Sequence, residues 1–501
     1  MSDLPTHADY VAVAKRLSLQ TQAYIDGVFR PALSGEVFPS INPATGEVLA
    51  EVAACGRADV DVAVQAAKQA FEDGRWSKLH PGERKAALLR LAQLMEEHQQ
   101  ELAVLESLDS GKPVCECAAV DVPETIKTLR WHAELIDKIY DTTAPAGPNV
   151  VALVTREAIG VVACVLPWNF PLLMLAWKIG PALASGCSVI VKPAELTTLS
   201  TLRVAELSAQ AGIPPGVFNV VTGTGKEAGE PIGLHPEIDM VSFTGSTATG
   251  RRFLRYAADS NLKRIVLECG GKNPAVVLAD AEDLAAVAQH VANGAFWNMG
   301  ENCSATSRLI VHESIKDALL AEIGKALASW KTGDPLDPRN RIGALISTGH
   351  FQKVSSYLET ARSDGCRVVF GGATSGGIYV EPTVIDGVSR ASRLFREEIF
   401  GPVLCVTTFR TVQEAIAIAN DTAYGLAASV FTSNQRHAMK LAREIRTGTV
   451  TVNCFGEGDV STPFGGLKES GFGGRDKSIH AHDQYTELKT VWIDVTEAEE
   501  A

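Results

Sequence analysis

Cys303 is the residue of this sequence best placed for nucleophilic chemistry. It lies in Ala295–Arg308 (AFWNMGENCSATSR), after a run whose apolar residues recur at the three- and four-residue spacing of a helix face. Asp280 is expected to cap that helix and Gly300 to end it, and Arg308–His312 is rich in strand-forming residues. A thiolate in the turn between them could attack a carbonyl carbon. The alternative is that Cys303 is one more small buried apolar residue, the commoner role of an intracellular cysteine.

A carboxylate with a second candidate role, Glu268, ends an apolar run in LECGGK (267–272). Two glycines follow closely and permit a sharp turn of the chain. Glu268 is therefore either a positioned general base or the solvated end of a strand, and most charged side chains are solvated. The segment by itself is compatible with both interpretations.

A repeated strand, loop and helix pattern would position these residues. Compact apolar runs separated by helical stretches predict five strands, at 161–166, 188–192, 217–221, 240–243 and 265–267. Such alternation is typical of a doubly wound parallel sheet in an α/β protein. In open sheets of this kind, ligands bind beyond the carboxyl ends of the strands.

Polar and glycine-rich segments follow four of these strands. They are Pro167–Pro171 (PWNFP), Lys192–Glu195 (KPAE), Thr222–Gly225 (TGTG) and Thr244–Ser246 (TGS). A dinucleotide requires backbone amides near its pyrophosphate, hydrogen bonds to its ribose hydroxyls and an apolar slot for its ring. Gly245 and Gly250 open a predicted helix and could hold phosphate, but this pattern is weak alone and no G-x-G-x-x-G is present.

Length, charge and cysteine usage limit the class of protein. The 501 residues exceed one ordinary core and predict two or three structural units, and the net charge of −13 disfavours nucleic-acid and anionic-membrane partners. The ten cysteines are scattered without a CxxC pair, which predicts neither a disulfide framework nor a metal site and suits the cytoplasm. No secretory signal is recognised at the N-terminus, and prolines and a lysine interrupt the apolar region 158–191, so no membrane span is expected.

The segments outside the repeated pattern predict a hairpin, helices and a separate pair of strands. Asp26-Gly27 within Tyr24–Phe29 is typical of a hairpin turn, and helices are expected over 60–71 and from Pro81 to 95. The apolar segments 149–154 and 486–493 require a partner edge, which predicts a homodimer or homotetramer.

Seven motifs in this order and spacing resemble the aldehyde dehydrogenase superfamily. They are PWNFP (167–171), KPAE (192–195), FTGS (243–246), LECGGKNP (267–274), GENCSATSR (300–308), EEIFGPV (397–403) and PFGGLKESG (463–471). The resemblance covers nearly the whole chain and is greatest to the branch that oxidises ω-amino, γ-glutamylamino and guanidino aldehydes. It implies an NAD-binding domain (1–140 and 160–269), an α/β catalytic domain (270–483) and a small β bridging segment (141–159 and 484–501) for oligomerisation.

The resemblance implies catalytic roles for four residues. Cys303 would add to the aldehyde, Asn169 and the Cys303 backbone N–H would hold the oxyanion, and Glu268 would activate the water that cleaves the thioester. Lys178 would share a proton relay with Asp476, where the family more often has Glu. A CoA-acylating relative would lack Glu268 and a non-catalytic relative would lack Cys303, so the alternative to the ω-amino branch is a broad-specificity aliphatic aldehyde dehydrogenase.

The implied cofactor is NAD. Lys192 and Glu195 would bind the adenosine ribose, and the Glu195 carboxylate would repel the 2′-phosphate of NADP. The other cofactor contacts implied by the resemblance are Trp168, Gly225, Gly245, Ser246, Glu398 and Phe400.

The implied substrate is a small aldehyde with a cationic end, from polyamine or arginine breakdown. Four carboxylates are expected at the entrance of the aldehyde tunnel: Asp121, Glu124, Glu457 and Asp459. Each charge-assisted hydrogen bond would contribute ~1.5–3 kcal/mol to binding. The alternative for Asp121 and Glu124 is a helix capping box. The aromatic tunnel residues implied are Phe170, Trp177, Trp297 and Phe464.

Two residues depart from the family pattern. Residue 301 is Glu where Gln is usual, and a negative charge two residues from Cys303 would disfavour its thiolate, so Glu301 is expected to point away from it. Residue 269 is Cys where Leu is common, which places a second thiol near the site.

Overall fold

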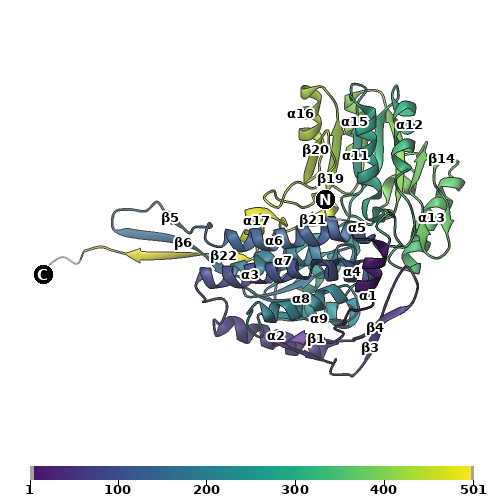
Figure 1. Cartoon of the computed structure of the whole chain (residues 1–501). Helices are drawn as coiled ribbons and strands as arrows, with labels where there is room; N and C mark the ends of the chain where they lie inside the picture. The colour runs from purple at the N-terminus through teal and green to yellow at the C-terminus, as the bar shows by residue number, and fades with distance from the viewer. Residues whose placement is uncertain (1–4, 498–501) are drawn as a thin grey trace.

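The computed structural model describes residues 5–497, which form a body around one sheet, a lobe around a second sheet and an arm of three strands (Figure 1). Among these residues no helix is long and apolar enough to cross a bilayer.

An eight-stranded sheet lies at the centre of the body. Its strands, in spatial order, are β2 (Val28–Arg30), β1 (Ala23–Ile25), β9 (Phe218–Val220), β8 (Ser188–Lys192), β7 (Val161–Val165), β10 (Met240–Thr244), β11 (Arg264–Glu268) and β21 (Gly471–Phe472). The five strands from β9 to β11 are parallel, and β1, β2 and β21 pair antiparallel at the two edges. The predicted α/β sheet is confirmed, with antiparallel edge strands added to it.

Helices cover both faces of this sheet. They are α1 (His7–Ala14), α2 (Arg57–Glu72), α3 (Pro81–Glu97), α4 (Gln99–Ser110), α5 (Val114–Glu116), α6 (Val122–Leu135), α7 (Pro171–Ser185), α8 (Leu199–Gln210), α9 (Glu230–Leu234) and α10 (Thr247–Ala258). Alternate residues of β7 belong to different cores: Val162 and Cys164 pack with α3, α6 and α7, whereas Val161 and Ala163 pack with α2 and α10. Burial on both faces explains why the central strands read as continuous apolar runs.

The N-terminal hairpin forms where the sequence predicts it. Tyr24 pairs with Phe29, and the two turn residues, Asp26 and Gly27, have φ of 54° and 77°. Two positive φ angles match the right-handed twist of the flanking strands, which is why Asp-Gly is favoured there. A second hairpin, β3 (Val37–Ile41) and β4 (Val48–Ala53), follows it.

The second lobe is built on a seven-stranded sheet. Its strands, in spatial order, are β14 (Arg367–Phe370), β17 (Thr383–Asp386), β18 (Val403–Phe409), β13 (Thr306–His312), β12 (Asn273–Val277), β19 (Ala427–Phe431) and β20 (Thr449–Val452). All but β14 are parallel. Its helices are α11 (Leu284–Phe296), α12 (Lys316–Leu327), α13 (Thr348–Ser363), α14 (Arg393–Arg396), α15 (Val412–Asn420) and α16 (Gln435–Glu444), and a two-stranded ribbon joins β15 (Thr374–Ser375) to β16 (Tyr379–Val380).

The helix that leads to Cys303 begins later than the sequence predicts. The carboxylate of Asp283 caps α11 by accepting a hydrogen bond from the Ala286 N–H (3.0 Å), so the expected cap at Asp280 is wrong. Asp280 instead accepts a hydrogen bond from the Thr432 hydroxyl (2.8 Å), a partner 152 residues away that the local pattern does not reveal. A 3-10 turn extends α11, and Gly300 ends it with φ of 67°.

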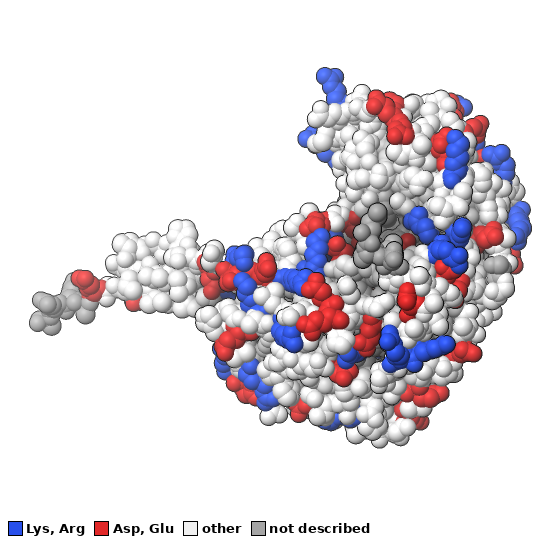
Figure 2. Space-filling view, viewed as in Figure 1, with Lys and Arg blue, Asp and Glu red and all other residues white. Residues whose placement is uncertain are grey.

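The arm is a three-stranded sheet of β5 (Thr142–Ala144), β6 (Val150–Ala158) and β22 (Thr486–Asp494), and α17 (Ser478–Gln484) leads into its last strand. β6 and β22 pair antiparallel over nine positions outside the two large sheets. The outer part of the arm carries few charged side chains on the face seen in Figure 2, and Leu488 and Trp492 are exposed.

The chain returns to the first sheet before it enters the arm. β21 lies within 270–483, the range that the sequence assigns to the catalytic domain, yet Phe472 pairs with Leu267 of β11. The two large sheets are therefore joined by the C-terminal segment as well as by the connection between β11 and β12.

Candidate active site

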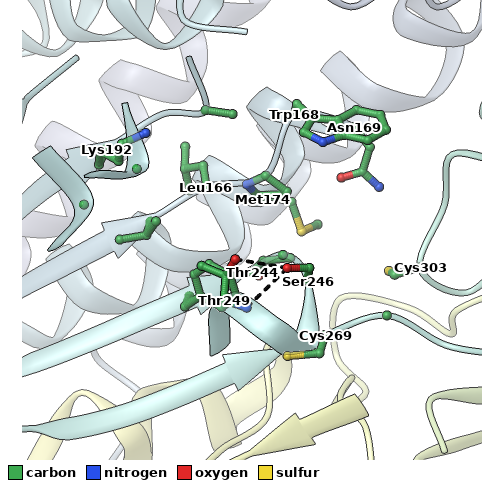
Figure 3. A pocket seen from close by; sticks show the side chains of 18 of the residues that line it. Leu166, Trp168, Asn169, Met174, Lys192, Thr244, Ser246, Thr249, Cys269 and Cys303 are labelled. Carbon is green, nitrogen blue, oxygen red and sulfur yellow. Dashed lines mark hydrogen bonds between the residues drawn. The ribbon is translucent and has the colours of Figure 1, made fainter. Parts of the chain in front are cut away.

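A cavity of about 480 Å³ lies at the carboxyl ends of β7, β8 and β10. Lys192 lines one end and Cys303 lines the other, so the cavity extends from the body towards the second lobe (Figure 3). This is the edge at which open parallel sheets bind ligands.

Cys303 lies in a tightly held loop between the 3-10 turn and β13. Asn298 and Met299 of the turn have φ of 52° and 56°, a left-handed conformation that is rare for residues other than glycine and is concentrated at functional sites. The Asn298 side chain donates hydrogen bonds to the backbone carbonyls of Asn169 (3.1 Å) and Glu301 (2.9 Å). Asn273 donates to the backbone carbonyl of Cys303 (2.8 Å), so the loop is fixed from two sides.

The Asn169 side chain, from the loop between β7 and α7, is held beside this nucleophile loop. Its amide donates to the Glu301 backbone carbonyl (2.9 Å) and points towards Cys303 (Figure 3). Lys112 donates to the backbone carbonyl of Asn169 (3.1 Å) from a buried ion pair with Asp121. An amide N–H fixed in this way is suited to stabilise a negative oxygen formed at Cys303.

The electrostatic surroundings of Cys303 favour its thiol over its thiolate. Burial raises the pKa of Cys303 well above its usual value, and the carboxylates of Glu457, Glu268 and Glu398 raise this pKa further. The thiol must therefore lose its proton as it attacks, which requires a proton acceptor at the site.

Glu268, at the end of β11, is a candidate acceptor. It is 3% exposed, and neither carboxylate oxygen has a hydrogen-bond partner among residues 5–497. Burial raises the pKa of Glu268 well above its usual value and Asp476 raises it further, against the opposing effect of Lys178 and Arg475. A carboxyl group tuned in this direction can act as a base near neutral pH.

Lys178 and Asp476 lie together, as the resemblance implies for a relay. The Lys178 ammonium is 3.4 Å from the Asp476 carboxylate and 3.1 Å from the Ser242 hydroxyl, and the side chains of Lys178 and Asp476 are fully buried. The shorter Asp side chain still reaches its partner.

All eight residues that the resemblance assigns to the cofactor line the cavity. They are Trp168, Lys192, Glu195, Gly225, Gly245, Ser246, Glu398 and Phe400. Lys192 is buried, and its ammonium donates to the Pro193 carbonyl (2.9 Å) and to Glu195 (3.4 Å). At the Cys303 end, the Glu398 carboxylate accepts a hydrogen bond from the Gly271 N–H (2.8 Å).

The cavity fits a dinucleotide. Ser246 caps α10 by accepting from the Thr249 N–H (3.3 Å), so the positive end of a twelve-residue helix opens at the cavity wall. A Cβ atom at Gly245 would lie 2.6 Å from the tip of the Phe243 ring, so a larger residue here would displace that ring. Lys192 and Glu195 offer polar contacts at one end, and Trp168 and Phe400 offer aromatic faces near Cys303.

Several lining residues were not found from the sequence. Thr249, Arg252, Phe253 and Tyr256 share one face of α10, a periodicity that could have indicated them. His350 and Lys353 come from α13, about 50 residues before Phe400, and no local motif marks them. Burial lowers the pKa of His350 to about 4, so the ring is neutral when it donates to the Phe400 carbonyl (2.6 Å).

The four aromatic residues expected in the tunnel form two contacting pairs. Phe170 contacts Trp297 with the two rings tilted by 40°, and Trp177 contacts Phe464; each pair has its ring centroids 5.2 Å apart. All four belong to, or pack against, the same apolar cluster as Cys303, and Phe170 also lines the cavity. We call this side of Cys303, with Glu457, the substrate side.

The expected cluster of four carboxylates is not present as such. Asp121 is fully buried against Lys112, so the expectation that it faces the entrance is wrong. The capping alternative is also wrong, because a π-helical turn precedes α6 and Asp121 makes no capping hydrogen bond. Glu124 and Asp459 remain exposed, and both pair with Lys127.

The two departures from the family pattern are accommodated. The Glu301 carboxylate is buried and has partners of its own, because it accepts from the Ile346 N–H (3.1 Å) and lies 3.5 Å from His350. Cys269 is buried and lines the cavity.

Comparison with known proteins agrees with this geometry. The chain belongs to the aldehyde dehydrogenase family, whose model matches residues 29–491. It is 69% identical to the aminoacetaldehyde dehydrogenase of Pseudomonas aeruginosa over 496 residues, which cover 99% of this chain and all of that protein.

Solved structures extend the similarity to the fold. The γ-glutamyl-γ-aminobutyraldehyde dehydrogenase of Burkholderia cenocepacia is 51% identical, with a TM-score of 0.96 over 98% of this chain and 100% of that one. The P. syringae indole-3-acetaldehyde dehydrogenase AldA, a mutant in complex with NAD+ and IAA, is 49% identical, with a TM-score of 0.97 over the same shares. These findings confirm the resemblance and the fold class.

Proposed function

We propose that this protein oxidises an amino aldehyde to the carboxylic acid with NAD+ as the acceptor. The observation that carries the proposal is the position of Cys303, between the fixed amide of Asn169 and a cavity that fits a dinucleotide. NAD+, when bound, supplies the acceptor for the hydride that leaves the substrate carbon.

The cofactor contacts are those that the family resemblance implies. Lys192 and Glu195 would bind the adenosine ribose, Gly225, Gly245 and Ser246 would line the pyrophosphate, and Trp168, Glu398 and Phe400 would hold the nicotinamide end. All eight residues line the cavity, which supports this assignment. The Glu195 carboxylate disfavours a 2′-phosphate, which makes NAD preferable to NADP.

The first half-reaction takes place at Cys303. Its sulfur bonds to the aldehyde carbon as the thiol proton passes to Glu268, and the carbonyl oxygen becomes an oxyanion. The Asn169 side-chain amide and the Cys303 backbone N–H donate hydrogen bonds to that oxygen, where a single donor typically changes the rate ~100-fold or more. Loss of hydride from this thiohemiacetal leaves a thioester on Cys303.

The second half-reaction requires a base. Glu268 removes a proton from water, the hydroxide formed adds to the thioester carbon, and the carbon–sulfur bond then breaks to release the acid and Cys303. Lys178 and Asp476 lie close enough to influence the charge of Glu268, which suits them to return its proton to solvent.

The substrate class is proposed from two supports. The curated relative and the solved neighbour named above act, by their names, on aldehydes that carry an amino or γ-glutamylamino group. On the substrate side, Glu457 places a carboxylate close to Cys303. Such aldehydes, with guanidino aldehydes, arise in polyamine and arginine breakdown; the alternative is a broad aliphatic range.

The test is NADH production against a panel of aldehydes. We expect aminoacetaldehyde, 4-aminobutyraldehyde and 4-guanidinobutyraldehyde to give higher kcat/KM than neutral aldehydes of equal length. Equal values would favour the aliphatic alternative, and no NADH with any aldehyde would refute the proposed activity.

We further infer a homodimer or homotetramer formed through the arm. Leu488, Trp492 and Ile493 of β22 are exposed, and a two-faced ribbon with apolar side chains is stabilised by a partner. Sedimentation of the purified protein tests this, with Trp492→Glu expected to shift it towards the monomer. The ten free thiols suit a cytoplasmic location.

A further inference from the structure

The substrate side contains more charge compensation than the sequence indicates. Its charged groups are Glu124, Lys127, Glu457, Asp459 and Lys477. The question is which of the three carboxylates has no ion pair and can bind a substrate cation.

Lys127 compensates the two outer carboxylates. Its ammonium is 2.8 Å from Asp459 and 3.4 Å from Glu124. These three side chains are each 43–54% exposed, so water also screens them. A cationic substrate would gain little there, since the two carboxylates already share a cation.

Lys477 occupies the aromatic pair. It is 4% exposed and adopts a φ of 62°, and its ammonium lies 5.1 Å from the Trp177 ring centre and 5.3 Å from that of Phe464. It also donates to the backbone carbonyl of Glu457 (2.8 Å). The protein's own ammonium therefore takes the place where aromatic faces would otherwise attract a substrate cation.

Glu457 is the carboxylate that forms no ion pair in the described part of the chain, although the Lys477 charge acts on it, and it lies next to the nucleophile. Its Oε1 accepts a hydrogen bond from the hydroxyl of Ser304, the residue after Cys303. Within residues 5–497 its side chain makes no ion pair and has no other hydrogen-bond partner, and the residue is partly exposed. Of the carboxylates that act on Cys303, it has the largest effect.

We propose that Glu457 is the specificity-determining residue that binds the ammonium group of the substrate. The inference rests on the proposed function and names one residue for its selectivity. Because Glu457 is anchored beside Cys303, it favours aldehydes whose primary ammonium is one or two methylenes from the carbonyl carbon. A quaternary ammonium has no N–H to donate to Glu457, and Lys477 already occupies the aromatic pair, so such aldehydes are disfavoured.

The experiment compares two aldehydes of equal size, aminoacetaldehyde and propanal. Gln at position 457 keeps an oxygen for the Ser304 hydroxyl and removes only the charge. We expect Glu457→Gln to lower the ratio of kcat/KM for aminoacetaldehyde to that for propanal about 10- to 100-fold, the range of a charge-assisted hydrogen bond. The ratio is the readout because removal of this charge also makes the Cys303 thiolate easier to form with both aldehydes. Glu457→Asp, which retains the charge, should still prefer aminoacetaldehyde.

A control variant and a second readout separate recognition from damage. Glu322→Gln removes one carboxylate from α12, where Glu322 pairs with Lys325 on the outer surface, and should leave both substrates unchanged. The pH dependence of Cys303 alkylation by iodoacetamide should move to lower pH in Glu457→Gln, because a nearby negative charge is gone. An unmoved alkylation profile would contradict the placement of Glu457 beside Cys303.

Two results would overturn the inference. They are an unchanged ratio of kcat/KM between the two aldehydes in Glu457→Gln, and equal kcat/KM for the two aldehydes in the wild type. The proposed function fails separately, if the wild-type enzyme forms NADH with neither aldehyde.

Discussion

The two sides of Cys303 are built in different ways. On the cofactor side, the cavity wall is formed by segments that directly follow parallel strands. Asn169, Lys192 and Ser246 each lie at or just after the end of a different strand. On the substrate side, residues from α6, α7 and the segment 457–477 meet across hundreds of residues. One side is a property of a repeated local pattern and the other of long-range packing.

This difference explains why charge is easier to interpret on one side than on the other. Lys192 and Glu195 are three residues apart and interact with each other, as their spacing suggests. By contrast, Asp121 lies in a π-helical turn and pairs with Lys112, and Asp459 pairs with Lys127, which is 332 residues away. The position of a carboxylate in the sequence therefore does not show whether its charge is neutralised, because the cation that pairs with it can come from a distant segment.

The nucleophile joins the two sides, and its loss should have the largest effect. Cys303→Ala should lower NADH formation by about 10⁴-fold or more, as nucleophile deletions typically do, while NAD binding is retained because the cofactor contacts stay intact. Steady-state kinetics and NAD titration measure the two effects. Cys366→Ala, at a thiol in the second lobe outside the cavity, is the matched control. Turnover near the wild-type level in Cys303→Ala would show that Cys303 is not the nucleophile that lies between the two sides.

Asp121→Asn tests whether a carboxylate chosen from the sequence is structural. It leaves Lys112 buried without its partner, which should reduce the free energy of unfolding by about 3 kcal/mol, the lower end of the usual range. The lower end is expected because Glu106, whose pKa burial and Asp121 raise to about 8, can ionise in its place. Denaturant unfolding gives this value.

The same variant should not change the ratio of kcat/KM between aminoacetaldehyde and propanal. If Asp121→Asn lost the preference for aminoacetaldehyde while its free energy of unfolding stayed unchanged, Asp121 would be a substrate-binding residue.

Glu268→Gln should slow thioester hydrolysis more than hydride loss. We expect a burst of NADH followed by a steady state about 100-fold slower than wild type, measured by stopped-flow absorbance. Because burial raises the pKa of Glu268, its basic form accumulates only as pH rises through that raised pKa. The wild-type steady state should therefore increase with pH over this range, and the variant should lose that limb. An equal reduction of burst and steady state would assign Glu268 another role.

Glu195→Ser should have the smallest effect. Glu195 is about half exposed, so removing its repulsion of a 2′-phosphate should change the NADP-to-NAD ratio of kcat/KM by only about fivefold. Ratios from parallel titrations with the two cofactors measure it. A constant ratio would mean that the ribose end is held by other contacts.

The sequence by itself determined the elements and the cofactor side. Continuous apolar runs such as 161–165 and 188–192 require burial on both faces, and this fixes a central parallel sheet. Because the carboxyl ends of parallel strands share an edge, the sequence alone predicts that PWNFP, KPAE and TGS lie together. The hairpin at Asp26-Gly27 was equally local.

Only the tertiary structure decided which charges are compensated. The hydrophobic pattern specifies the face of an element, but an ion pair depends on a distance of a few ångströms between side chains that the pattern does not constrain. Asp283 caps α11, whereas Asp280, the cap predicted from the sequence, accepts a hydrogen bond from Thr432. For the same reason Asp121, Glu124 and Asp459 pair with lysines, Lys477 lies against the aromatic pair, and Glu457 lies beside Cys303 without an ion pair among residues 5–497.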